Sequence, residues 1–272
     1  MVKLRSCLVF AVLFCLTVPS WAAPDPSLKA LEGFKDIGVD EHLGKTLDFK
    51  DLSFVDESGK SVALDSYFNQ GKPVLISLVY FECPSLCTFV LNGLSKTLRE
   101  TKDLPGEKFE VLTLSINPKE GPELAARKKA SYVTSVGKPE VAKGWHFLTG
   151  QEPQILKVAD QLGFRYKYDE AEKQFAHPAV LMVLSPEGKI SRYLYGIDFP
   201  PRDLKFALLE ASLGKTGSVS DKVMMFCYQY DPKLRTYSLV IGRILQIAAA
   251  LTLLIFGGYL GSVWLRRSTH VE

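Results

Sequence analysis

An uninterrupted apolar segment, Val74–Phe81, constrains the fold of this chain more than any other feature. It follows Lys72-Pro73, contains no charged residue and is rich in β-branched and aromatic side chains. Strands that are apolar along their whole length are typically buried on both faces of a sheet. The sequence therefore predicts a sheet covered on both sides, with this strand near its centre.

The segments around this strand alternate between strand and helix patterns. The predicted elements are a hairpin at 54–64; strands at 74–81, 109–116 and 145–148; helices at about 84–98, 120–135 and 153–162; a second hairpin joining 180–184 to 190–195; and a last helix at about 201–213. Short strands separated by helices of this length form α/β folds. We expect a mixed sheet flanked by helices.

The first 22 residues have the pattern of a secretory signal peptide. Lys3 and Arg5 precede an apolar stretch from Cys7 to Val18, and small residues suited to cleavage continue to Ala22. An uncleaved N-terminal anchor is the alternative interpretation. In both cases the body of the protein is expected to be exported.

A second apolar segment, Ile247–Leu265, carries no charge and has almost the ~20 residues needed to cross a bilayer. We predict a single transmembrane helix at 238–265 and a short cytoplasmic tail at 266–272. Arg266-Arg267 follows the segment at once, and basic residues beside a span tend to remain in the cytoplasm. Three aromatic residues are expected in the interface zones of the membrane: Tyr237, Tyr259 and Trp264.

The part between the signal peptide and the anchor has about 200 residues, enough for one hydrophobic core. It divides into a lead-in at 23–47, a folded domain at 48–214 and a juxtamembrane linker at 215–237. The expected location is the cell membrane, crossed once, with the main domain on the periplasmic or extracytoplasmic side. A net charge of +3 is too small to indicate nucleic-acid binding.

Two cysteines after the central strand, Cys83 and Cys87, carry the most specific chemical signal in the chain. If the segment from Pro84 is helical, residues four apart share one face, with Cβ atoms about 5–6 Å apart. One soft metal ion or one disulfide would then join both sulfurs. A static disulfide is the weaker alternative, because structural disulfides more often close longer loops. A helix N-terminus beside Cys83 would favour its thiolate.

Four segments carry a family resemblance: Val79–Cys87, Leu114–Pro118, Phe147–Gly150, and His177 with the following Val180–Gly188. Together they resemble the SCO (SenC) family, membrane-anchored copper proteins with a thioredoxin-like fold. The resemblance extends over roughly 48–213 and implies a thioredoxin-like mixed sheet. Members of this family are implicated in building the dinuclear copper centre of cytochrome c oxidase.

The resemblance implies a copper site formed by Cys83, Cys87 and His177. Thiolates are preferred ligands of Cu(I), which also accepts imidazole. Pro178 stands where thioredoxin-like folds often have a cis-proline. The implied function is that of a metallochaperone, which delivers copper to the dinuclear centre of cytochrome c oxidase and assists its assembly. Its partner would be the copper-bearing oxidase subunit or another exported thiol or copper protein.

Two features depart from the family pattern. Family members usually have Asp-Pro, followed shortly by Asp-Thr, in the loop before the next helix. Here Asn117-Pro118 is present, and Gly121-Pro122 stands where the second acid is expected. The predicted anchor is also C-terminal, whereas better-known members are tethered at the N-terminus.

The alternative function is that of an enzyme, a thiol–disulfide oxidoreductase acting on an exported or oxidase-subunit target. Cys83 would attack and Cys87 would resolve the mixed disulfide. Both activities fit one mechanism, because only the reduced pair binds metal. A transmembrane sensor is disfavoured, since 266–272 leaves little chain across the membrane. Other soft or basic side chains stay open as extra ligands or packed residues: Met224, Met225 and Cys227, and the histidines His42, His146 and His270.

Overall fold

The computed structural model describes residues 36–82, 86–212, 228–231, 236–239 and 241–268. The predicted signal peptide and most of the lead-in segment lie outside these ranges. The chain divides into two units, 1–36 and 37–272, and the second contains every element below.

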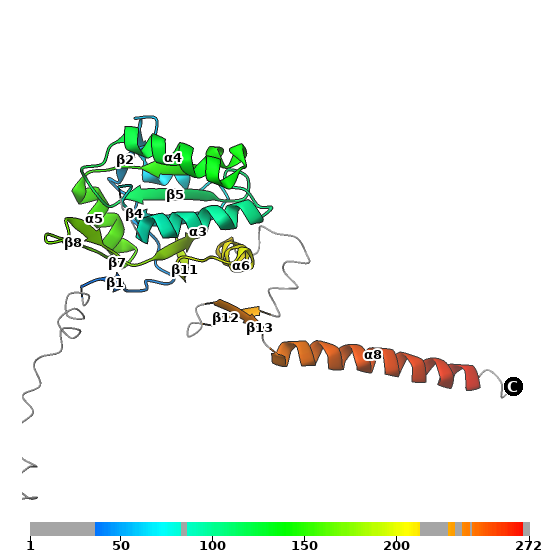
Figure 1. Cartoon of the computed structure of the whole chain (residues 1–272). Coiled ribbons are helices and arrows are strands. Elements are labelled where there is room, and N and C mark those ends of the chain that lie inside the picture. Colours follow the sequence, from blue (N-terminus) through cyan, green and yellow to red (C-terminus); the bar gives the residue numbers. More distant parts are fainter. Residues whose placement is uncertain (1–35, 83–85, 213–227, 232–235, 240, 269–272) are drawn as a thin grey trace, which may run out of the picture. The chain divides into compact units, whose positions relative to one another are not determined.

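A five-stranded mixed sheet forms the centre of the second unit (Figure 1). Its strands, in spatial order, are β11 (Ile190–Tyr195), β10 (Val180–Leu184), β4 (Val74–Val79), β5 (Glu110–Ser115) and β6 (Trp145–Leu148). The β4, β5 and β6 strands are parallel, whereas β10 is antiparallel to both β4 and β11. The predicted α/β fold with a mixed sheet is therefore confirmed.

Helices flank this sheet, close to the predicted positions (Figure 1). They are α3 (Leu86–Glu100), α4 (Pro122–Val136), α5 (Glu152–Gln161) and α6 (Pro201–Ala211), with 3-10 turns η2 (Leu64–Tyr67) and η3 (Pro139–Lys143). Proline opens α4 and α6, at a position whose N–H has no partner within the helix. Gly137 ends α4 in the left-handed conformation at φ 72°.

Short two-stranded ladders surround the main sheet. The pairs are β1 (Gly38–Val39) with β7 (Phe164–Arg165), β2 (Ser53–Val55) with β3 (Ser61–Ala63), β8 (Lys167–Asp169) with β9 (Gln174–Ala176), and β12 (Tyr228–Asp231) with β13 (Thr236–Leu239). Only the β2–β3 hairpin matches a sequence prediction.

The core is centred on β4, as its composition predicts. All six residues of β4 and all six of β5 are buried. Thr113 of β5 links polar side chains of the two neighbouring strands within this core. Its hydroxyl accepts hydrogen bonds from Trp145 Nε1 at 2.9 Å and from Ser77 Oγ at 3.0 Å. Buried hydroxyls that are paired in this way avoid the desolvation penalty of an unsatisfied polar group.

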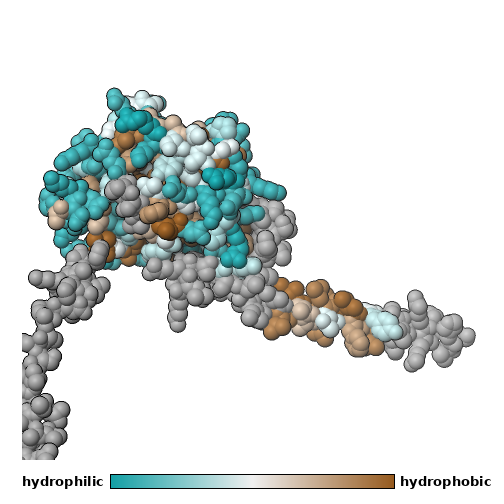
Figure 2. Space-filling view, viewed as in Figure 1, coloured by the Kyte–Doolittle hydropathy of each residue, from teal (hydrophilic) through white to brown (hydrophobic). Residues whose placement is uncertain are grey.

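The C-terminal segment forms a hairpin and a long helix. The helix α8 (Ile241–Ser268) exposes large apolar side chains, including Leu253 and Leu254, which are 73% and 72% exposed. Figure 2 shows the coloured part of α8 to be mostly hydrophobic, whereas the surface of the domain is mostly hydrophilic. Among the residues that the structure describes, no helix is both long and apolar enough to cross a bilayer. The structure thus does not show the transmembrane helix at 238–265, which stays a prediction from the sequence.

The expected membrane-interface position of Tyr237 is wrong. Tyr237 is only 2% exposed, and its ring contacts Phe206 of α6 at a centroid distance of 5.3 Å. Its hydroxyl donates to Glu210 Oε2 at 2.8 Å. The region predicted to be a linker at 215–237 therefore contains part of a hairpin that packs on the domain.

Candidate metal and thiol site

The predicted site lies where β4 ends. Residues 83–85, including Cys83, lie outside the described part of the chain. The described helix α3 begins at Leu86, so its first turn contains the backbone of Cys87. A helix N-terminus favours a thiolate in that turn. The shared helical face of the two cysteines stays a prediction.

His177 lies beside the residues that immediately precede Cys83. Strands β10 and β4 pair with Leu181 opposite Ser77. Extending this antiparallel register by four residues puts His177 level with Phe81, two residues before Cys83. The ring contact between His177 and Tyr80, at a centroid distance of 6.1 Å, agrees with this register.

The His177 ring is enclosed by aromatic side chains. It is 6% exposed, and it lies between the rings of Tyr80 and Phe164, the latter at a centroid distance of 6.0 Å. Its Nδ1 lies 3.0 Å from the carbonyl oxygen of Pro178. Because a carbonyl only accepts, the neutral ring donates from Nδ1 and has its lone pair on Nε2. Nε2 is therefore the nitrogen suited to binding a metal.

The peptide bond between His177 and Pro178 is trans. No cis peptide occurs in the part of the chain that the structure describes. The expected cis-proline is therefore wrong. Pro178 and Ala179 connect His177 to β10, whose pairing with β4 brings His177 level with Phe81.

The buried carboxylate of Glu120 binds the backbone of the two residues before Cys83. Glu120 Oε2 accepts from the backbone N–H of Phe81 at 2.8 Å, and Oε1 accepts from that of Glu82 at 2.9 Å. The hydroxyl of Ser115, the last residue of β5, also donates to Oε2 at 2.5 Å. Glu120 is only 7% exposed. It thus ties the ends of β4 and β5 together immediately before Cys83.

The described side chains do not by themselves complete a metal site. Among them, no three His, Cys, Asp or Glu residues lie close enough to hold one ion. Cys83 and Cys227 lie outside the described residues, and the side chain of Cys87 does as well. The ligand set of Cys83, Cys87 and His177 therefore stays a prediction.

Two other histidines have different surroundings. His42 Nδ1 lies 3.0 Å from the carbonyl oxygen of Gln161. His146 lies between the carboxylates of Glu57 and Glu110, at 3.9 and 3.6 Å. Both have partners within the fold, while His270 lies outside the described residues.

The SCO1/SenC family model matches residues 43–207 of this chain. The chain belongs to the SCO1/SenC family. The matched range contains the cysteine pair, His177, and the β4, β5 and β10 strands that surround them. The resemblance drawn from the sequence motifs is confirmed.

Several known proteins and solved structures are similar to this chain. The SCO1 protein homolog of Bacillus subtilis (strain 168) is 25% identical over 158 residues, which is 56% of this chain and 76% of that protein. A solved structure from Aquifex aeolicus VF5, named as a candidate electron transfer protein, is 28% identical. It covers 62% of this chain and 94% of its own, with a TM-score of 0.55. Arabidopsis thaliana ScoI with copper bound is 19% identical, with a TM-score of 0.49 and coverages of 64% and 99%.

The departures from the SCO loop pattern leave the loop intact. Asn117 Oδ1 accepts from the backbone N–H of Lys119 at 3.1 Å, a turn contact that the usual aspartate would also make. Glu120 supplies a buried acid although Gly121-Pro122 replaces the expected Asp-Thr. The sequence pattern predicts a helix from about Glu120, but α4 begins at Pro122. An acid between Asn-Pro and Gly-Pro was the available signal, and it was missed.

Proposed function

We propose that this SCO family protein is a membrane-anchored metallochaperone that binds copper through Cys83, Cys87 and His177. It delivers the copper to the dinuclear centre of cytochrome c oxidase and assists assembly of that centre. Family membership supports this assignment, because SCO proteins bind copper and take part in oxidase assembly. The acceptor is the copper-bearing oxidase subunit or another exported thiol or copper protein.

The position of His177 carries the proposal. Strand pairing brings a buried imidazole from about ninety residues downstream to the level of Phe81. Its Nδ1 is occupied by a backbone carbonyl, which orients Nε2 as a ligand. Two thiolates and one imidazole form a soft, low-coordinate donor set, which is the kind of set that Cu(I) prefers.

Dithiol chemistry is the second candidate function. The N-terminal position of Cys87 in α3 favours a thiolate, which is the form that attacks disulfides as well as the form that binds metal. A thiol–disulfide oxidoreductase would need the two cysteines but would not need His177. The histidine therefore separates the two functions.

The anchor is also a proposal. Its support is the uncharged segment Ile247–Leu265, the pair Arg266-Arg267 after it, and the exposed apolar side chains of α8. In this arrangement the domain lies on the extracytoplasmic side, after export by the signal peptide at 1–22. Retention of the full chain in membranes after alkaline washing, together with its release when 241–272 are deleted, would support the anchor. Release of the full chain would contradict it.

The deciding experiment is a copper titration of the reduced, purified full chain against a competing Cu(I) chelator. The expected result is one tightly bound copper per chain. Binding should be lost in Cys83→Ser/Cys87→Ser, and it should be weakened at least about tenfold in His177→Ala, which removes one of three ligands. His42→Ala is the matched control, because it removes an imidazole that lies outside the predicted site.

Two results would contradict the chaperone proposal. One is failure of the reduced chain to compete with the chelator while a Cys83–Cys87 disulfide forms and is readily reduced. That outcome favours the oxidoreductase. The other is equal loss of copper affinity in His177→Ala and His42→Ala, which would assign the loss to general destabilisation.

A further inference from the structure

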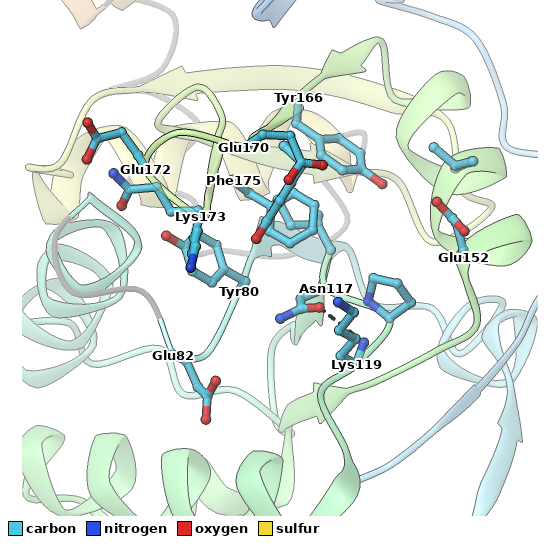
Figure 3. Close-up of a pocket in the computed structure, with 15 residues that line it drawn as sticks. Tyr80, Glu82, Asn117, Lys119, Glu152, Tyr166, Glu170, Glu172, Lys173 and Phe175 are labelled. Atoms are coloured by element: carbon cyan, nitrogen blue, oxygen red, sulfur yellow. Dashed lines mark hydrogen bonds between the residues drawn. The ribbon is translucent and has the colours of Figure 1, made fainter.

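A groove of about 630 Å³ opens beside the end of β4 (Figure 3). One wall comes from the β8–β9 hairpin and the residues before it, and the other from the turn after β5 and the start of α5. The groove is lined by Tyr80, Glu82, Ile116, Asn117, Pro118, Lys119, Glu152, Leu156, Tyr166, Tyr168, Glu170, Glu172, Lys173, Gln174 and Phe175.

Aromatic rings form the apolar wall of this groove. Phe175 is in ring contact with Tyr80, Tyr166 and Tyr168, at centroid distances of 5.6, 5.9 and 5.0 Å. Tyr168 is 39% exposed, and Leu156 on the facing side is 50% exposed. Mutual ring contacts fix the shape of the wall, so a partner can bind without a large ordering cost.

The charged residues of the groove are mostly acidic. Four glutamates, Glu82, Glu152, Glu170 and Glu172, face two lysines, Lys119 and Lys173. Within the described part of the chain, none of these six side chains forms an ion pair. The carboxylates are therefore available to a cationic partner, although the whole chain has a net charge of +3.

The residues lining the groove adjoin the predicted thiol and metal ligands. Glu82 immediately precedes Cys83, and Phe175 lies two residues before His177. The rings of Tyr80 and His177 are in contact. A chain segment lying in the groove would therefore end beside the groups that exchange copper or electrons.

We propose that this groove binds an extended segment of the acceptor protein that carries lysine or arginine beside an aromatic or aliphatic residue. The carboxylates pair with the basic head groups, while the tyrosine and phenylalanine faces pack against the aliphatic stems and contribute cation–π attraction. This inference rests on the proposed function, because it identifies the partner surface of the same site.

Thiol exchange with two synthetic peptides tests the preference. The probes are the symmetrical disulfides of acetyl-Lys-Phe-Gly-Cys-amide and acetyl-Glu-Phe-Gly-Cys-amide. The reduced Cys83–Cys87 pair loses two electrons and two protons and forms its disulfide, while each peptide disulfide gains them and is released as two thiols. At low salt the lysine peptide should react about tenfold faster than the glutamate peptide, and the ratio should shrink as salt rises.

The variant Glu152→Gln/Glu170→Gln/Glu172→Gln should bring the ratio of the two rates close to one. Its matched control, Glu100→Gln/Glu107→Gln/Glu140→Gln, removes three exposed glutamates outside the groove and the same total charge. An unchanged ratio in the groove variant, or an equal drop in the control, would overturn the proposal.

A second readout does not depend on thiols or copper. In Cys83→Ser/Cys87→Ser, acetyl-Lys-Phe-Gly-Ser-amide should shift the backbone amide resonances of 166–175, and the glutamate analogue should not. Shifts confined to other surfaces, or no shifts, would refute the groove. Failure of the native chain to bind copper, with these shifts retained in the variant, would refute the proposed function alone.

Discussion

Glu120→Gln should weaken both the fold and the copper site, and the two losses are separable. Glutamine retains the shape of the side chain, but its amide presents one acceptor oxygen where the carboxylate presents two. One of the N–H groups of Phe81 and Glu82 then faces an NH₂ group. A hydrogen bond to a charged group contributes about 1.5–3 kcal/mol, and a buried donor left unsatisfied costs about 1–3 kcal/mol. We therefore expect the free energy of unfolding to fall by about 2–4 kcal/mol.

The effect on copper follows from the backbone that Glu120 holds. Releasing two residues immediately before Cys83 means that copper binding has to order them again, at about 1–2 kcal/mol per residue. Copper affinity should then fall at least about tenfold, since about 1.4 kcal/mol corresponds to a factor of ten. Urea denaturation measures the first loss, and chelator competition under native conditions measures the second.

Glu110→Gln is the matched control. Glu110 is also a buried carboxylate, 5% exposed, but it begins β5, whereas Glu120 lies in the turn after that strand, and it pairs with Lys72 at 2.9 Å. This variant should lose stability without losing copper affinity. The reasoning is refuted if Glu120→Gln binds copper within about twofold of the native chain although its stability has fallen as expected.

Three further predictions concern stability, each measured by the urea unfolding midpoint. Gly93→Ala should lower the free energy of unfolding by about 1–3 kcal/mol, because a Cβ at position 93 would lie 2.0 Å from the carbonyl oxygen of Ile197. An unchanged midpoint would contradict this close approach. Tyr237→Phe should cost about 1.5–3 kcal/mol through the lost bond to Glu210, and Tyr237→Ala about 3–5 kcal/mol. Equal effects in the two variants would argue against a packed ring. Burial raises the pKa of Tyr166 from 10.0 to about 12, so stability that is fully present below pH 10 is lost as the pH rises towards 12. Tyr166→Phe should reduce this loss of stability at alkaline pH. If the variant loses as much stability as the native chain, the raised pKa of Tyr166 is not its cause.

The central elements were predictable because their signals are local. The apolar run of β4 and the turn residues Ser185–Lys189, which join the two strands of the β10–β11 hairpin, are readable within single segments. The β8–β9 ladder has three-residue strands, and all three residues of β8 are exposed, so neither burial nor periodicity marks it. The β12–β13 hairpin escaped prediction for a different reason. Its buried Tyr237 depends on a partner on α6, far away in the sequence.

The site was predictable only in part. The family resemblance predicts that His177 lies near the cysteine pair. Among the described residues, the pairing of β10 with β4 brings His177 beside Tyr80 and level with Phe81. Glu120 could not be inferred from residue type alone, because exposed and buried glutamates look identical in a sequence. Its role depends on two backbone N–H groups about forty residues earlier, which only the parallel β4–β5 pairing brings within reach.

The pairing of β10 with β4 makes the predicted metal site dependent on the register of the core. A slip of β10 along β4 by two residues would preserve which side chains are buried, yet it would displace His177 by about 7 Å. Copper bound through His177 and the thiols would oppose such a slip, since a ligand that binds only the native register stabilises that register. Copper loading should therefore raise the resistance of the whole sheet to unfolding, and His177→Ala should remove most of that gain.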